Sequence, residues 1–293
     1  MIHHRSRCVV ILSARSSGSS ALQNLLVQSD GVRHIDRTPH FEYETLFWVK
    51  AASILGRPQI KIADSRLPLP VEESRAGLRA LLQDNIGPSY ALPAEDAALV
   101  FDGWRDLCQH YAPIFVEKSP HHLHEWAALE LLLESLNRAP EVEVMFVGLV
   151  RNPMDTLYSM WQRWRGLPHH NQRDWCTAYS NLLRLRGLVG ERLLIIRYED
   201  MVSDPTRLAP IYRFMGLPAP PPGYLHDKAL AKWRGDPRFR FRLDPAAVML
   251  AEQFGYDSSD LENRSSPLWW LYAAASRWYV RRLKPLAQSL RAD

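Results

Sequence analysis

The stretch Val144-Met-Phe-Val-Gly-Leu-Val-Arg-Asn-Pro-Met-Asp-Thr-Leu-Tyr-Ser159 says most about the fold of this chain. It begins with a continuous apolar run, which predicts a strand that is buried on both faces. Pro153 suits the first position of a helix, and Asn152 before it is expected to cap that helix. Arg151 and Ser159 would lie near the positive end of the helix, where both could bind a phosphate. The alternative is an arginine at a strand end and a serine that faces solvent.

A second anion-binding loop is predicted near the N-terminus. The apolar run Cys8–Leu12 indicates another buried strand, and Ala21–Val27 has the pattern of a helix. The loop Ser13-Ala-Arg-Ser-Ser-Gly-Ser-Ser20 joins them, and in such a unit backbone N–H groups converge on a phosphate. The loop contains no lysine and therefore lacks the G-x-x-x-x-G-K-[ST] motif of nucleotide triphosphatases, so Arg15 is the nearby cation. A serine-rich turn without a ligand is the alternative.

A third buried strand is predicted within Pro113–Pro120, with Lys118 emerging at its end. Ligands of open α/β sheets bind outside the carboxyl ends of the strands, so Lys118, Arg15 and Arg151 would share one rim. Three cations on one rim suggest a ligand with several negative charges.

Three histidines, His121, His122 and His124, follow this strand. Their spacing and the absence of nearby cysteine favour the start of a helix over 123–136 rather than a metal site. No pair of carboxylates stands out as a Mg²⁺ site, so no metal is expected.

A candidate general base lies in the segment 38–50, which is rich in aromatic residues and in which Thr38 and the proline after it predict a helix start. The segment contains His40, Glu42 and Glu44, and desolvation beside apolar rings can bring a carboxyl pKa towards neutrality. We favour Glu44. The alternative is that the acids complement the dipole of the predicted helix.

The length of 293 residues is compatible with one large α/β domain with insertions or with two domains. We predict a single domain over residues 1–293, with a mostly helical excursion at about 54–110 and a helical extension at about 265–293. The net charge of +4 and the pI of about 9.0 favour anionic ligands, but no nucleic-acid-binding motif is present. The three cysteines are widely spaced and suggest neither disulfides nor zinc. The N-terminal apolar run is too short for a signal peptide, so a cytoplasmic protein is expected.

Two segments near the C-terminus combine basic and aromatic residues. The first contains Lys232, Trp233 and Arg234 and is either a flap that contacts phosphate or a solvated basic loop. The second, residues 267–284, is too short and too polar at its end to span a bilayer, but it has the composition of a segment that lies on a membrane or partner surface.

Taken in order, four motifs resemble those of the sulfotransferases that use 3′-phosphoadenosine 5′-phosphosulfate (PAPS). They are Arg15–Leu22, Glu117–Pro120, Arg151–Ser159 and Arg197–Met201. The resemblance implies an α/β fold of P-loop NTPase-like sulfotransferase architecture, with a central parallel sheet flanked by helices.

The resemblance also implies roles for individual residues. The first loop would bind the 5′-phosphosulfate through a set of six residues, namely Arg15, Ser16, Ser17, Gly18, Ser19 and Ser20. Arg151 and Ser159 would bind the 3′-phosphate, Tyr198 would lie near the nucleotide, and Lys118 would assist the transferring group. The family loop has its basic residue closer to the glycine. Here either the loop carries one extra residue, or Ser16 occupies the basic position and Lys118 supplies the charge.

The implied reaction is in-line transfer of a sulfuryl group to a hydroxyl, or failing that an amine, of a carbohydrate, lipid or small metabolite. Glu44, or failing it Glu42 or His40, would accept the proton, and adenosine 3′,5′-bisphosphate would be released. Two other classes stay open: a P-loop kinase that uses ATP and Mg²⁺, and a non-catalytic protein that kept the fold.

Overall fold

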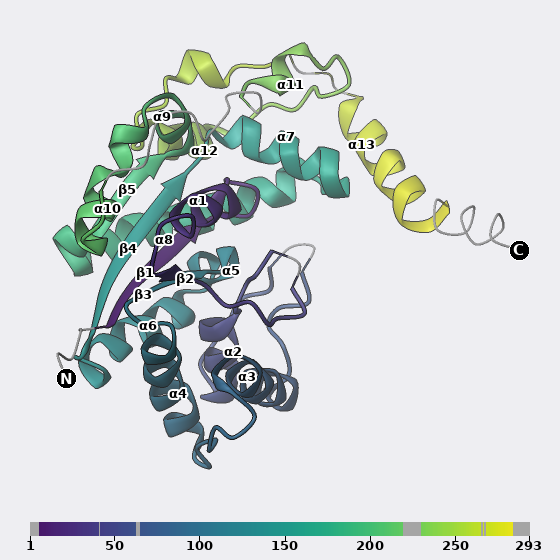
Figure 1. Cartoon of the computed structure of the whole chain (residues 1–293). Coiled ribbons are helices and arrows are strands. Elements are labelled where there is room, and N and C mark those ends of the chain that lie inside the picture. Colours follow the sequence, from purple (N-terminus) through teal and green to yellow (C-terminus); the bar gives the residue numbers. More distant parts are fainter. Residues whose placement is uncertain are drawn as a thin grey trace, which may run out of the picture.

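A five-stranded parallel sheet forms the centre of the computed structural model, which describes residues 6–40, 42–62, 65–218, 230–264, 266 and 268–283 (Figure 1). The strands are β1 (Ser6–Ser13), β2 (Val32–Arg33), β3 (Ile114–Lys118), β4 (Val142–Val150) and β5 (Leu193–Arg197). Their order across the sheet is β2-β3-β1-β4-β5. The predicted α/β class with a central parallel sheet is confirmed.

Helices cover both faces of the sheet. In chain order they are α1 (Ser19–Leu26), α2 (Phe47–Ile54), α3 (Val71–Ile86), α4 (Asp96–His110), α5 (Pro120–His124), α6 (Trp126–Arg138), α7 (Pro153–Trp164), α8 (Pro168–Val189), α9 (Tyr198–Ser203), α10 (Ala209–Met215), α11 (Lys232–Gly235), α12 (Pro245–Glu252) and α13 (Trp269–Trp278). The helix α7 begins at Pro153, as predicted, and Asn152 caps it through its side chain.

Alternate residues of each strand enter two separate apolar cores. In β1, Val9 and Ile11 pack with α1, α9 and α10, whereas Val10 and Leu12 pack into the larger core on the other face. Because successive side chains of a strand point to opposite faces, a continuous apolar run is what a sheet covered on both sides requires.

The carboxyl ends of four strands bring the predicted motifs together. β1 leads into the serine-rich loop and α1, β3 into α5, β4 into α7, and β5 into α9. Since these strands are parallel, all four connections lie at the same edge of the sheet (Figure 1).

The prediction that a helix starts at Thr38 is wrong, because α2 begins only at Phe47. The Thr38 hydroxyl accepts a hydrogen bond from the backbone N–H of His40 (3.2 Å) and donates one to the backbone oxygen of Glu44 (3.2 Å). Such local side-chain bonds offer the backbone an alternative to a helix. The acids before α2 therefore do not belong to a first helical turn.

The helix predicted over 123–136 is divided in two. Glu125 has an extended backbone (φ −105°, ψ 102°) and separates α5 from α6. Its carboxylate accepts the backbone N–H of Ile60 from a distant loop. Two helices, α3 and α4, lie within the segment 54–110 for which a helical excursion was predicted.

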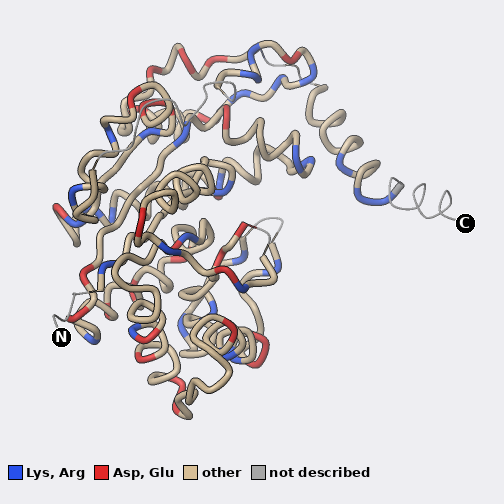
Figure 2. The backbone as a smooth tube through the Cα atoms, viewed as in Figure 1, with Lys and Arg blue, Asp and Glu red and all other residues tan. Residues whose placement is uncertain are grey.

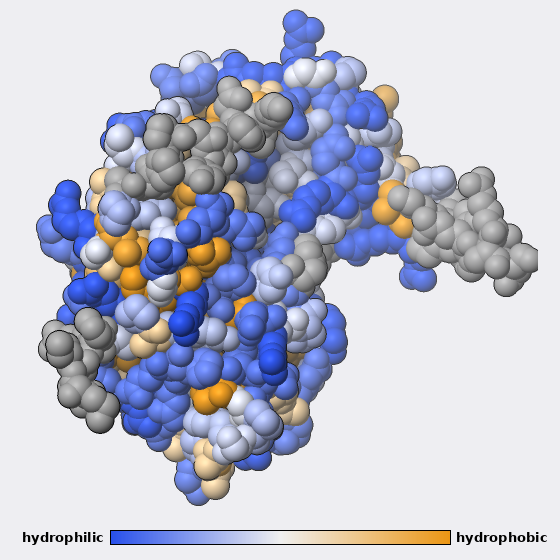
Figure 3. Space-filling view, viewed as in Figure 1, coloured by the Kyte–Doolittle hydropathy of each residue, from blue (hydrophilic) through white to orange (hydrophobic). Residues whose placement is uncertain are grey.

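The helix α13 projects from the body of the molecule near the described end of the chain (Figure 1). Acidic and basic residues are spread over most other elements (Figure 2), and the space-filling view shows that α13 stands apart (Figure 3). Of the helices in the described ranges, none is both long enough and apolar enough for a transmembrane span. The remainder of the predicted extension, at 284–293, lies outside the described residues.

Candidate functional site

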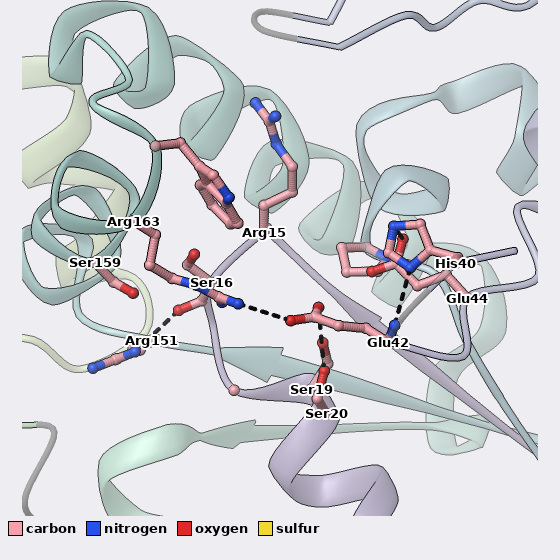
Figure 4. Close-up of a pocket in the computed structure, with 13 residues that line it drawn as sticks. Arg15, Ser16, Ser19, Ser20, His40, Glu42, Glu44, Arg151, Ser159 and Arg163 are labelled. Carbon is pink, nitrogen blue, oxygen red and sulfur yellow. Dashed lines mark hydrogen bonds and ion pairs between the residues drawn. The ribbon is translucent and has the colours of Figure 1, made fainter. Parts of the chain in front are cut away.

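One pocket of about 210 Å³ at the carboxyl edge of the sheet collects most of the predicted site residues (Figure 4). Its lining comes from the serine-rich loop, the segment before α2, the start of α5, and α7 with the residue before it. The lining residues are Arg15, Ser16, Gly18, Ser19, Ser20, His40, Glu42, Glu44, Pro120, Arg151, Ser159, Arg163 and Trp164.

The loop after β1 depends on a glycine. Gly18 lies at φ 92° and is the residue before the first turn of α1, while Ser16 also has a positive φ of 62°. The first N–H groups of a helix have no partner within the helix, so the start of α1 can bind an anion through its backbone. The ring of Tyr198 packs directly against Gly18, because a Cβ atom built there would lie 2.3 Å from Tyr198 Cε2.

Ser17 faces the protein interior instead of the pocket. It is fully buried, and its hydroxyl lies 2.9 Å from that of Tyr179 in α8. Tyr179 donates to the backbone oxygen of Leu149 in β4 (3.0 Å), and burial raises its pKa to about 12. This tyrosine, which the sequence did not single out, attaches the loop to the sheet.

Replacing Gly18 with alanine should destabilise the protein by about 2 to 5 kcal/mol. A left-handed backbone costs about 1 to 2 kcal/mol for a residue with a Cβ, and forcing a methyl group into a packed contact adds about 1 to 3 kcal/mol. The buried ring of Tyr198 occupies that space. Chemical denaturation of both proteins gives the difference in the free energy of unfolding.

Gly56→Ala is the matched control for this change. Gly56 also has a positive φ (62°), but a Cβ there meets nothing within 4 Å. The control should therefore lose only about 1 to 2 kcal/mol, from the backbone alone. Equal losses in the two variants would show that the contact with Tyr198 does not constrain the loop.

Arg151 connects two of the predicted motifs. It is 7% exposed, its Nη1 donates to the backbone oxygen of Ser16 (3.0 Å), and its guanidinium lies 4.7 Å from the centroid of the Tyr198 ring. Ser159, two helical turns further along, lines the same pocket. The predicted arginine and serine pair is therefore brought together by α7.

The first turn of α7 binds groups of the protein itself. Asn152 Oδ1 accepts the backbone N–H groups of Met154 (2.9 Å) and Asp155 (3.4 Å). The backbone N–H of Asn152 donates to Glu199 (2.9 Å). An anion in the pocket would therefore meet the side chains of Arg151 and Ser159 rather than these amides.

Lys118 is buried beneath the loop. Its Nζ donates to Ser20 Oγ (3.2 Å) and to the backbone oxygen of Glu42 (2.6 Å), and lies 3.7 Å from Glu44 Oε1. Burial lowers the pKa of Lys118, an effect that the neighbouring carboxylates partly oppose. Arg15 instead directs its guanidinium to Asp174 of α8 (2.8 Å), although it also lines the pocket. Of these two cations, Lys118 is the one that contacts a serine hydroxyl of the loop.

The segment before α2 is held in place by the end of β3. Thr45 Oγ1 donates to Glu117 Oε1 (2.6 Å), and the backbone N–H of Leu46 donates to Ser119 Oγ (2.9 Å). These bonds place the preceding residue, Glu44, beside Lys118. The two hydrogen bonds join residues that are 72 and 73 positions apart in the sequence.

Glu44 lies among three basic side chains. Its Oε2 is 3.5 Å from His121 Nδ1 and 3.6 Å from His40 Nε2, and Lys118 approaches the other oxygen. Burial by itself would raise the pKa of Glu44, but its hydrogen bond with His121 and the electrostatic effect of the three basic neighbours outweigh burial and lower the pKa. The carboxylate is therefore ionised at neutral pH.

His40 and Glu42 are engaged differently. His40 Nδ1 accepts the backbone N–H of Glu42 (3.3 Å), which leaves the proton on Nε2, the nitrogen that faces Glu44. The Glu42 carboxylate pairs with Arg163 (3.1 Å) and accepts from Ser20 (3.4 Å), as Figure 4 shows. Of the three candidate bases, Glu44 is the carboxylate with two imidazoles beside it.

Three residues in or beside the pocket were missed by the sequence analysis. His121, which was interpreted as the start of a helix, does not line the pocket but contacts Glu44, and burial lowers its pKa. Arg163 and Trp164, at the end of α7, line the pocket itself. The position of His121 just after a buried strand was the available signal, whereas the other two resemble surface residues in the sequence.

A second cavity of about 310 Å³ lies beside the start of α7 and is lined by Asn152, Asp155, Trp233 and Arg234, among others. Trp233 is 2% exposed, and Arg234 pairs with Asp260. Lys232 is exposed and lines neither cavity. Burial raises the pKa of Asp155 to about 6.

No group of three or more histidine, cysteine or acidic side chains in the described part of the chain could hold a metal ion. The histidines after β3 have other partners. His122 Nε2 accepts the backbone N–H of Trp48 (3.1 Å), and His124 Nδ1 lies 3.1 Å from the backbone oxygen of Pro120.

Comparison with known proteins identifies both a family and a fold. The sequence model of the sulfotransferase family matches residues 8–221. The structure is similar to the sulfotransferase domain from the curacin biosynthetic pathway (TM-score 0.55, 19% identity, 85% of this chain and 97% of that chain). It is equally similar to the sulfotransferase domain from the Synechococcus PCC 7002 olefin synthase (TM-score 0.55, 19% identity, 88% and 98%). A search of curated proteins with the sequence found no significant match.

Proposed function

Because the chain belongs to the sulfotransferase family, we propose that it transfers a sulfuryl group from PAPS to a hydroxyl group of an acceptor. The observation that carries the proposal is the meeting of three elements in one pocket: the glycine and serine loop, the Arg151 and Ser159 pair, and Glu44, which has the buried Lys118 beside it. Each element suits one part of a donor with several negative charges.

The donor would lie along the edge of the sheet. The N–H groups at the start of α1 and the hydroxyls of Ser19 and Ser20 suit the 5′-phosphosulfate. Arg151 and Ser159 suit the 3′-phosphate, because a buried guanidinium can bind a phosphate through two parallel hydrogen bonds. Tyr198 would support this end of the donor site, because its ring packs against Arg151, whose guanidinium carbon lies 4.7 Å from the ring centroid.

The nucleoside would extend into the second cavity. Asn152, which lines it, follows Arg151 directly in the chain, and Asp155 lines it from the first turn of α7. Trp233 offers an aromatic surface there, and the buried carboxyl of Asp155 offers hydrogen bonds to a base. Arg234 lines the same cavity, whereas Lys232 would contact the donor only through a movement of its exposed side chain.

Transfer requires a base and charge stabilisation. The donor supplies an activated sulfuryl group whose leaving group is a phosphate. Glu44 would accept the acceptor's proton, with His40 and His121 orienting its carboxylate. Lys118 and the amides at the start of α1 would stabilise the negative charge that develops on the leaving phosphate. Arg15 would act through Asp174, by holding the loop against α8.

The acceptor is proposed to be a hydroxyl compound, with carbohydrates, lipids and small metabolites as the candidate classes and an amine as the weaker choice. The rim of the pocket combines a half-exposed tryptophan, Trp164, with Arg163 and His40. An aromatic and basic rim fits a partly apolar acceptor with polar groups.

Labelling experiments would test the transfer. The protein is incubated with a cell extract and PAPS that carries radioactive sulfur. A parallel sample receives Mg²⁺ and ATP labelled at the γ-phosphate. We expect labelled product only from PAPS, because the loop has no lysine of the kind that P-loop kinases use. The Arg151→Ala variant serves as the control for adventitious transfer. Label transferred from ATP instead would contradict the proposal and favour the kinase.

A further inference from the structure

The helix α13 exposes more aromatic surface than a helix of a soluble domain normally does. Of its residues, Trp269 and Ala273 are buried, whereas Trp270 is 61% exposed and Trp278 is 59% exposed. Tyr279, in the π-helical turn that continues the helix to Leu283, is 54% exposed. The projecting position of α13 in Figures 1 and 3 accounts for this exposure.

Four of the exposed apolar residues form a stripe along α13. Leu271, Ala274, Ala275 and Trp278 are all exposed and follow the i, i+3, i+4, i+7 spacing of one helix face. This face lies opposite the buried pair, Trp269 and Ala273. An apolar stripe of this kind on a projecting helix indicates a binding surface.

The charge of the same segment has one sign. Residues 268–283 contain Arg277, Arg281 and Arg282 and no aspartate or glutamate. Figure 2 shows these basic positions towards the end of the helix, with no acidic position along it. The surface is therefore both apolar and positively charged.

We propose that residues 268–283, here called the α13 segment, bind the surface of a lipid bilayer that carries anionic lipids. Tryptophan and tyrosine side chains prefer the boundary between acyl chains and headgroups, and arginine is attracted by anionic headgroups. A short amphipathic helix with these residues lies in the plane of the interface.

Charge favours the bilayer over a second copy of the chain. Pairing of two copies through the stripe would bring two sets of arginines together, and the segment has no acidic residue to neutralise them. An anionic bilayer supplies the opposite charge and an apolar interior at the same time.

The α13 segment is attached to the part of the molecule that contains the pocket. Trp269 Nε1 donates to the backbone oxygen of Arg238 (2.8 Å), and the Tyr272 ring lies 6.5 Å from the ring of Trp161 in α7. The same helix contributes Ser159 and Trp164 to the pocket. A bilayer bound by the segment would therefore lie next to α7.

Binding of the bilayer does not depend on the proposed transferase activity.

Co-sedimentation with vesicles tests the proposal. We expect the full chain to bind vesicles of phosphatidylcholine mixed with phosphatidylglycerol, and to bind vesicles of phosphatidylcholine alone at least roughly tenfold more weakly. Raising the salt concentration should weaken binding to the anionic vesicles. Equal sedimentation with both kinds of vesicle, or with neither, would overturn the proposal.

Matched variants assign the binding to the segment. The double variant Leu271→Ser with Trp278→Ser, and separately Arg282→Glu, should each lower binding to the anionic vesicles roughly tenfold or more. The control is Leu188→Ser with Met249→Ser, which removes apolar residues that are 62% and 65% exposed on α8 and α12. Its binding should be unchanged. Thermal unfolding of each variant verifies that the fold is retained.

Two results would contradict the assignment. One is equal binding by the stripe variant and the control variant. The other is a concentration-dependent dimer, seen by sedimentation velocity, that the stripe variant abolishes, because the surface would then serve a second copy of the chain.

Discussion

Replacing Arg151 with alanine should weaken the binding of adenosine 3′,5′-bisphosphate by about 30-fold or more. Removing one partner of a buried, hydrogen-bonded charge pair costs about 2 to 5 kcal/mol, and every 1.4 kcal/mol is a factor of about ten. Arg151 is 7% exposed and also holds the loop through the backbone oxygen of Ser16. Isothermal titration calorimetry measures the affinity directly.

Two further variants make this result specific. Arg151→Lys should restore only part of the affinity, since lysine cannot make two parallel hydrogen bonds to a phosphate. Arg163→Ala removes an arginine of the same pocket that is 46% exposed and already pairs with Glu42, so its effect should stay within about tenfold. An unchanged affinity of Arg151→Ala would exclude this residue from the 3′-phosphate site.

Replacing Glu44 with glutamine should lower kcat for sulfuryl transfer by about 100- to 10,000-fold, the usual contribution of a general base. Donor affinity should change little, because Glu44 would contact the acceptor rather than the nucleotide. Glutamine keeps the shape of the side chain but cannot accept the proton. The measurement is the initial rate with the acceptor that the labelling experiment identifies, together with calorimetry of adenosine 3′,5′-bisphosphate.

The pH dependence gives a second readout for Glu44. Its surroundings lower its pKa below the ordinary value of a glutamate, so the carboxylate becomes protonated only at a lower pH than a free glutamate does. The acid limb that this group contributes to the pH–rate profile should therefore lie at a lower pH than the limb of an unperturbed glutamate.

Glu42→Gln is the matched control for this prediction. Glu42 belongs to the same segment and pocket, but its carboxylate pairs with Arg163 and Ser20. This variant should retain a rate within about tenfold of the native one. A large loss in Glu42→Gln together with a native rate in Glu44→Gln would transfer the role of base to Glu42.

The residues that these predictions concern differ in how far the sequence alone could identify them. The importance of Arg151 and Ser159 followed from an apolar run, a proline and the spacing of two residues. Both residues line the pocket because the helix geometry between them is local and regular. The cap at Asn152 could be predicted for the same reason.

The environment of Glu44 could not be predicted in this way. The sequence suggested a helix from Thr38, whereas hydrogen bonds of Thr38, Thr45 and Leu46 keep the segment irregular and hold it against the end of β3. Two of these bonds join residues far apart in the chain, and no local pattern encodes them. The contact of Glu44 with His121 follows from them.

The two cations near the first loop, Arg15 and Lys118, show the same difference between what the sequence and the tertiary structure determine. Arg15 stands next to the loop serines in the sequence, but in the structure it pairs with Asp174, whereas Lys118 reaches Ser20 from the neighbouring strand. Parallel pairing of β1 with β3 brings Lys118 opposite Ile11, and only that pairing determines which cation lies beneath the loop.

The sequence by itself therefore determined the three buried strands, the start and cap of α7, and the edge of the sheet at which charged residues meet. These features depend on local periodicity and on the rule that parallel strands share a carboxyl edge. The tertiary structure alone decided which side chains touch at that edge, among them Glu44 with His121 and Ser17 with Tyr179. Such contacts arise from packing between elements, whose positions depend on the whole fold rather than on neighbouring residues.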